Sequence, residues 1–157
     1  MISIISFILD NLISNFINHN SLFYPLFTML SLILIYPKFN KKDNKYYIYS
    51  FILGLIYDIT VSDTLFLNAF IFLLLSYILK YIFKKIPYNY LSILIISILS
   101  IVYYRLVTYL TLILLNYLNF NILMLLKSIY SSLILNIIYI SILHNKTLIF
   151  KKKNHIN

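Results

Sequence analysis

The chain has 157 residues, of which 62% are hydrophobic and only 11% are charged, and this composition excludes an ordinary soluble domain of that length. It contains no cysteine, which excludes disulfides and thiolate metal sites. The net charge of +9 suits nucleic-acid binding, but the lysines lie in short connections between apolar runs, where they indicate membrane topology and no nucleic-acid partner.

Six apolar runs follow one another along the chain, and each predicts a membrane-spanning helix. The runs comprise residues 2–17, 22–36, 46–61, 64–83, 88–118 and 122–143. The first three are slightly short for a hydrocarbon core of about 30 Å, and the fifth is long enough to tilt or project. The first run lacks the basic start and the small-residue cleavage site of a signal peptide, so we expect it to stay in the protein as the first helix. The sequence therefore predicts an all-α membrane protein, a six-helix transmembrane bundle.

Basic residues gather in every second connection. They are Lys38, Lys41, Lys42 and Lys45, then Lys80, Lys84 and Lys85, and finally Lys146, Lys151, Lys152 and Lys153. The alternate connections, 18–21, 62–63 and 119–121, carry no lysine or arginine. Because positively charged connections stay in the cytoplasm, we expect both termini there. Residues 1–145 then form the integral membrane domain and 146–157 a basic cytoplasmic tail, disordered from Lys151 onward beside anionic lipid.

Four ionisable residues interrupt the apolar runs: Asp10, Asp58, Arg105 and Lys127. Each costs about 2.5–3.5 kcal/mol in a bilayer and needs a partner. Counting residues from the ends of the runs puts the last three at similar depth, so we expect Asp58 to pair with Arg105 or Lys127. Hydrogen bonds across helices are expected from Asn68 and Asn136. These groups could form a proton pathway, but two carboxylates without an intramembrane histidine favour a structural role.

The only glycine and the only alanine, Gly54 and Ala69, lie fifteen residues apart in one hydrophobic hairpin. Small residues let membrane helices approach closely. We therefore expect a tightly packed hairpin, with Asp58 at its outer end.

Recognised catalytic patterns are missing from the chain. One glycine cannot build a phosphate-binding loop, and no serine has the flanking glycines of a nucleophile elbow. The histidines, His19, His144 and His155, are scattered and form no zinc motif. We expect no enzymatic activity, no metal and no cofactor.

The hairpin sequence resembles the MreD family of rod shape-determining proteins. In that family a helix ending in Gly-Leu-x-x-Asp, here residues 54–58, precedes a short loop and a helix beginning near Gly-x-(Asn/His)-Ala, here residues 66–69. Phe66 stands where the family often has glycine. The chain length, Pro25 at the second run and the lysines after the fourth run also fit.

This resemblance implies a six-helix scaffold, similar in shape to the substrate-binding subunits of vitamin transporters. It implies a non-enzymatic part of the cell-elongation machinery in the bacterial cytoplasmic membrane, which maintains rod shape. The main partner would be MreC, in an assembly that joins MreB filaments to RodA and its class B penicillin-binding protein. Structural or interaction roles would fall to Gly54, Asp58, Asn68, Ala69, Arg105 and Lys127.

Two alternatives stay open at this point. The chain could be a transporter subunit that binds a small vitamin-like ligand in a pocket lined by Asp58, Asn68, Arg105 and Lys127. It could also be a small holin-like or accessory membrane protein.

Overall fold

The computed structural model describes residues 1–16, 25–39, 44–62, 64 and 66–153, and these residues form helices with no strand among them. The elements are α1 (Ile2–Phe16), α2 (Phe27–Ile35), η1 (Tyr36–Lys38), α3 (Lys45–Tyr57), η2 (Asp58–Ser62), α4 (Leu67–Lys85), α5 (Tyr90–Leu114) and α6 (Ile122–Lys153). The predicted all-helical fold with six α-helices is confirmed.

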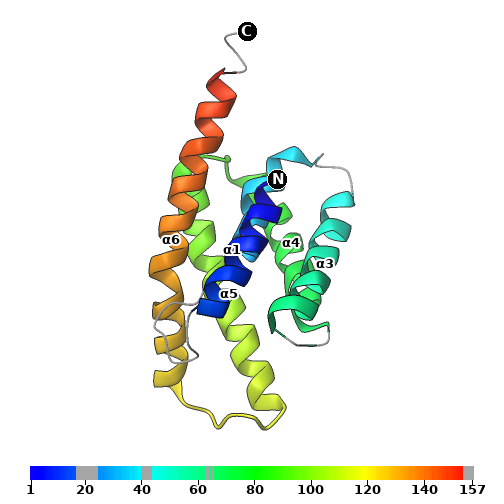
Figure 1. Ribbon diagram of the computed structural model, residues 1–157, viewed down its shortest axis with the longest axis vertical. Helices are drawn as coiled ribbons and strands as arrows, with labels where there is room; N and C mark the ends of the chain where they lie inside the picture. The colour runs from blue at the N-terminus through cyan, green and yellow to red at the C-terminus, as the bar shows by residue number, and fades with distance from the viewer. Residues whose placement is uncertain (17–24, 40–43, 63, 65, 154–157) are drawn as a thin grey trace.

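The six helices pack as three hairpins, α1 with α2, α3 with α4 and α5 with α6 (Figure 1). Helix α2 contacts all five other helices, and each of its nine residues is buried. Its sequence, apolar on every side, suits this central position, because a helix surrounded by others has no solvent-facing or lipid-facing stripe.

Within the described residues, three helices are long and apolar enough to cross a membrane: α4, α5 and residues Ile122–His144 of α6. The apolar stretches Ile2–Ser14 and Phe27–Lys38 are shorter. Helix α3 continues into η2, a π-helix that begins at Asp58. A sixfold crossing therefore stays a prediction for the first half of the chain.

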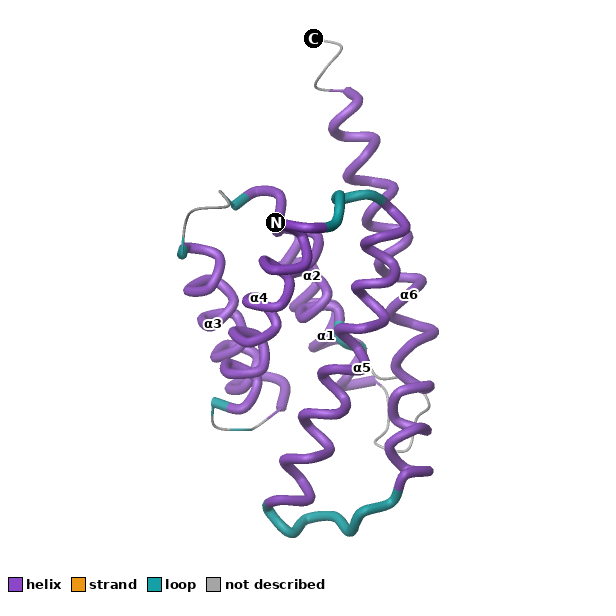
Figure 2. Tube along the Cα trace, turned by 180° about the vertical axis from the view of Figure 1, so that it is seen from behind, coloured by secondary structure: helices purple, strands orange, loops and turns teal. Residues whose placement is uncertain are grey.

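The alternation of basic connections corresponds to the two ends of the bundle. The N-terminus, η1, the start of α3, the α4–α5 connection and the C-terminal end of α6 lie at one end, which we call the lysine end (Figure 1, Figure 2). The end of η2, the start of α4 and the α5–α6 connection lie at the other end. We expected disorder from Lys151 onward, but helix α6 continues to Lys153, so this prediction is wrong for residues 151–153. Residues 154–157 and the connection 18–21 lie outside the described residues.

Helix α5 ends earlier than its apolar run because of a local turn. Asn116 takes a left-handed conformation with φ 58°, and the amides of Asn116 and Tyr117 donate to the carbonyls of Ile113 and Leu112. These two bonds form a Schellman motif, and asparagine tolerates the left-handed position better than most residues. The polar residue at 116 thus stops the helix inside an otherwise apolar run.

Candidate functional site

Helices α3 and α4 meet backbone to backbone at Gly54. A Cβ atom on Gly54 would lie 2.6 Å from the Cα atom of Ala69 and 2.6 Å from the carbonyl oxygen of Asn68. Both neighbours are backbone atoms of α4, so they cannot move aside without shifting the helix. The structure thus brings Gly54 and Ala69 into direct contact, at a position where only glycine fits.

Asp58 caps the start of α4 from the end of the preceding helix. Its Oδ1 accepts hydrogen bonds from the backbone N and the Nδ2 of Asn68, at 3.0 and 2.9 Å, and its Oδ2 accepts one from the backbone N of Ala69 at 3.0 Å. The hydroxyls of Ser62 and Thr64 also donate to Oδ1. Asp58 is buried, and it satisfies amides that the first turn of any helix leaves without a partner.

The expected ion pair of Asp58 with Arg105 or Lys127 is wrong. Every donor to the Asp58 carboxylate in the described chain comes from residues 62–69. The Nε of Arg105 donates instead to the Oγ of Ser132 on α6, at 2.6 Å. Lys127 is exposed near the N-terminal end of α6. The positive end of α4 and three side-chain donors stabilise the carboxylate, so it needs no cation.

Asn68 extends this cap to a third helix. Its Oδ1 accepts a hydrogen bond of 2.7 Å from the hydroxyl of Tyr104 on α5, and both residues are buried. The bond across helices expected from Asn68 is confirmed. Asp58, Asn68 and Tyr104 therefore connect the α3–α4 hairpin to α5.

A second aspartate caps α2 in the same manner. Asp10 on α1 is fully buried, and its Oδ1 and Oδ2 accept hydrogen bonds from the backbone N atoms of Phe27 and Thr28, at 2.9 and 2.7 Å. The Oδ1 of Asn136 on α6 accepts from the backbone N of Leu26 at 2.8 Å, which confirms the bond across helices expected from Asn136. Three elements thus meet at the start of the central helix.

Sequence reasoning missed this role of Asp10. A signal for it was present: helix α2 follows Pro25 and Leu26 and has no Ser, Thr, Asp or Asn at its own N-cap, so another segment had to supply the acceptor. Among the described residues, Asp10 is the buried carboxylate nearest to this start in sequence. No sequence pattern, however, indicated that Tyr104 would reach Asn68.

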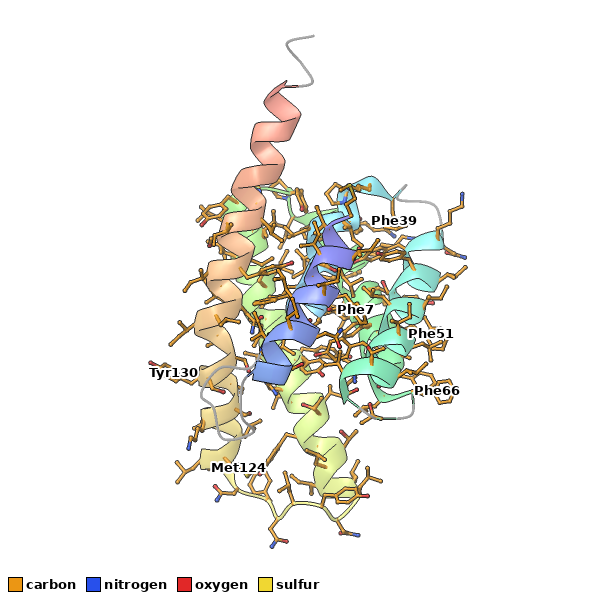
Figure 3. All side chains as sticks on the ribbon, viewed as in Figure 1. Phe7, Phe39, Phe51, Phe66, Met124 and Tyr130 are labelled. Atoms are coloured by element: carbon orange, nitrogen blue, oxygen red, sulfur yellow. The ribbon has the colours of Figure 1, made fainter. Side chains whose placement is uncertain are left out.

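The turn before α4 carries backbone strain. Phe66 precedes α4 with φ 62°, a left-handed conformation that glycine adopts freely and most other residues avoid. Its side chain is 54% exposed and points away from the bundle (Figure 3). The left-handed backbone at this position explains why the MreD resemblance predicts a glycine there.

We expect Phe66→Gly to stabilise the protein. Relief of about 1–2 kcal/mol of left-handed strain exceeds the added chain entropy of glycine, about 0.5–1 kcal/mol, so the free energy of unfolding should rise by about 0.5–1 kcal/mol. Thermal unfolding in detergent, followed by circular dichroism, measures this change. Phe70→Gly, at an exposed position inside α4, is the control and should destabilise by about 1 kcal/mol. A lower Tm for both variants would contradict the strain.

The arrangement connects helices through buried polar side chains. Both carboxylates are occupied by several donors, and no group of three or more metal-ligating side chains gathers among the described residues. Buried polar groups that bond across helices fix their relative positions in a membrane.

The family model described as rod shape-determining protein MreD matches residues 1–153. The chain belongs to the MreD family. The match spans all six helices of this MreD chain, including both aspartate caps and the Gly54 contact. Neither a curated protein nor a solved structure matches the chain. Membership of the MreD family, together with three helices able to cross a bilayer, makes it a rod shape-determining membrane protein.

Proposed function

We propose that this MreD-family chain is a non-enzymatic scaffold of the cell-elongation machinery in the bacterial cytoplasmic membrane. It binds MreC as its main partner and links MreB filaments to peptidoglycan synthesis by RodA and a class B penicillin-binding protein. Its lysine end, with both termini, faces the cytoplasm, as the alternation of basic connections favours.

The family match over 1–153 is the observation that carries this proposal. The bundle supports it, because the buried polar side chains described above are used to join its own helices. Large apolar side chains such as Leu74 and Leu99 remain exposed on the outside of the helices. Figure 3 shows Tyr130 in such a position on α6. Such faces suit contact with lipid and with partner helices, which associate in membranes through close packing.

The alternative of a vitamin-binding subunit gains no support from the structure. The four residues expected to line a pocket do not converge: Asp58 and Asn68 bond each other, Arg105 bonds Ser132, and Lys127 is exposed. An apolar hollow between α4 and α5 has a volume of about 40 Å³, whereas small-molecule sites hold about 300–1,000 Å³. The likeness in shape to vitamin-transporter subunits stays a prediction.

Co-purification tests the scaffold directly. The tagged chain is expressed with MreC from the same genome, extracted in mild detergent and isolated through the tag. We expect stoichiometric MreC and no stoichiometric vitamin-like molecule in the eluate, with Ile52→Leu, a conservative change at an exposed position, as a control that keeps MreC. Recovery of a bound vitamin-like molecule without MreC would contradict the proposal.

A further inference from the structure

The seam between α4 and α5 is incompletely packed. The two helices are consecutive and joined by residues 86–89, yet they contact each other far less than the members of the three hairpins do. The apolar hollow of about 40 Å³ lies in this seam. Four aliphatic side chains on α4, between Leu75 and Ile82, line one wall, and Ile96, Leu99, Ser100 and Tyr103 on α5 line the other.

The residues that line the hollow follow one stripe on each helix. On each helix the lining residues are spaced i, i+3, i+4 and i+7, which places them on one stripe. Ile78 and Leu99 at its rim are 41% and 55% exposed. The Ser100 hydroxyl donates to the carbonyl of Ile96 in its own helix, so it presents little polarity to the hollow. At about 10–15 Å³ for each water-sized group, the space accepts roughly three methylene groups.

A positive charge lies where this stripe reaches the lysine end. Lys85 follows Ile78 and Ile82 at the same helical spacing, so it continues the α4 wall. Its ammonium group lies 4.4 Å from the ring centre of Tyr81 and donates to the Tyr81 hydroxyl at 2.6 Å. Lys84 lies on a different stripe of α4, together with Lys80. The ammonium group of Lys80 lies over the ring of Tyr47 on α3.

We propose that the α4–α5 seam binds one anionic phospholipid of the surrounding membrane. A short segment of one acyl chain occupies the hollow, and the headgroup phosphate contacts Lys85. In a bilayer the molecules beside an apolar opening are lipids, and a lysine at the interface favours those with a negative headgroup. The snorkelling of a long lysine side chain over a tyrosine ring suits this depth. This site is independent of MreC, so it can fail while the scaffold function stands.

Native mass spectrometry of the purified full chain tests the headgroup contact. The probe is phosphatidylglycerol, with phosphatidylcholine of the same chains as the neutral comparison. We expect preferential retention of a single phosphatidylglycerol, reduced about fivefold by Lys85→Gln, since one lysine near an anionic surface contributes about 1 kcal/mol. Lys84→Gln, an equal change of charge on the neighbouring stripe, should leave retention unchanged. Equal retention of both lipids, or equal effects of both variants, would overturn the proposal.

A second measurement on the unmodified chain tests the acyl chain and does not depend on a variant that folds. Phosphatidylglycerols with shortening chains and inorganic phosphate compete against the long-chain lipid. We expect competition to weaken as the chains shorten and inorganic phosphate to have no effect. Competition by inorganic phosphate or by the shortest lipid at equal concentration would show a headgroup contact alone and would overturn the role of the hollow.

Discussion

Gly54→Leu should separate α3 from α4 and cause the largest loss of stability among single substitutions in the hairpin. Even Gly54→Ala places a Cβ atom 2.6 Å from the backbone of α4, and overpacking of this kind costs about 1–3 kcal/mol; leucine should exceed that range. The shift also displaces Asn68 and Ala69, and with them the amides that Asp58 caps. A lower Tm in detergent, with reduced recovery of MreC, is the expected result.

The matched control for Gly54→Leu is Ile52→Leu, two residues earlier in α3. Ile52 is 49% exposed, so a substitution there should change the free energy of unfolding by less than about 0.5 kcal/mol. If Gly54→Leu unfolds at the temperature of this control and binds MreC equally well, close backbone packing is not what holds the hairpin.

Asp58→Ala should be the second large effect, because it leaves the amides of Asn68 and Ala69 buried without an acceptor. Each such donor costs about 1–3 kcal/mol, and lost helix caps cost about 0.5–2 kcal/mol, so we expect a loss of about 2–4 kcal/mol. Asp58→Asn keeps one oxygen acceptor and should lose about half as much. Thermal unfolding measures the size of the loss. Hydrogen exchange at the first turn of α4 should rise in Asp58→Ala.

A double-mutant comparison separates this cap from an ion pair. Because the donors to Asp58 come from residues 62–69, the costs of Asp58→Asn and Arg105→Gln should add in the double variant. A double variant clearly more stable than the sum predicts would show that the two charges do interact.

The two aspartate caps suggest why so apolar a bundle tolerates buried carboxylates. Asp10 and Asp58 each satisfy two consecutive backbone amides at the start of a neighbouring helix. A carboxylate held in this way is a fixed part of the helix start, because the helix dipole favours negative charge there. The caps therefore join α1 to α2 and α3 to α4 without any ion pair.

Much of the architecture was readable in the amino-acid sequence. The apolar runs predict the helices, the lysines predict which connections share an end, and the lone Gly54 and Ala69 predict a close hairpin. These features are local, because hydropathy, charge and side-chain size belong to each residue and do not depend on which distant residues it contacts. The Gly-Leu-x-x-Asp pattern and its Asn-Ala partner led to the family for the same reason, since they describe one short hairpin.

Only the tertiary structure decided which groups the buried charges meet. Counting residues placed Asp58 and Arg105 at one depth, but depth does not determine the direction in which a side chain points. Helix packing turns Arg105 toward Ser132 and brings the amides of α4 within 3.0 Å of Asp58. Helix packing also buries α2 and places Asp10 and Asn136 where they accept hydrogen bonds from the backbone amides at its start. Hydrogen bonds form only at contact distance, so their partners follow from the packing of helices distant in sequence.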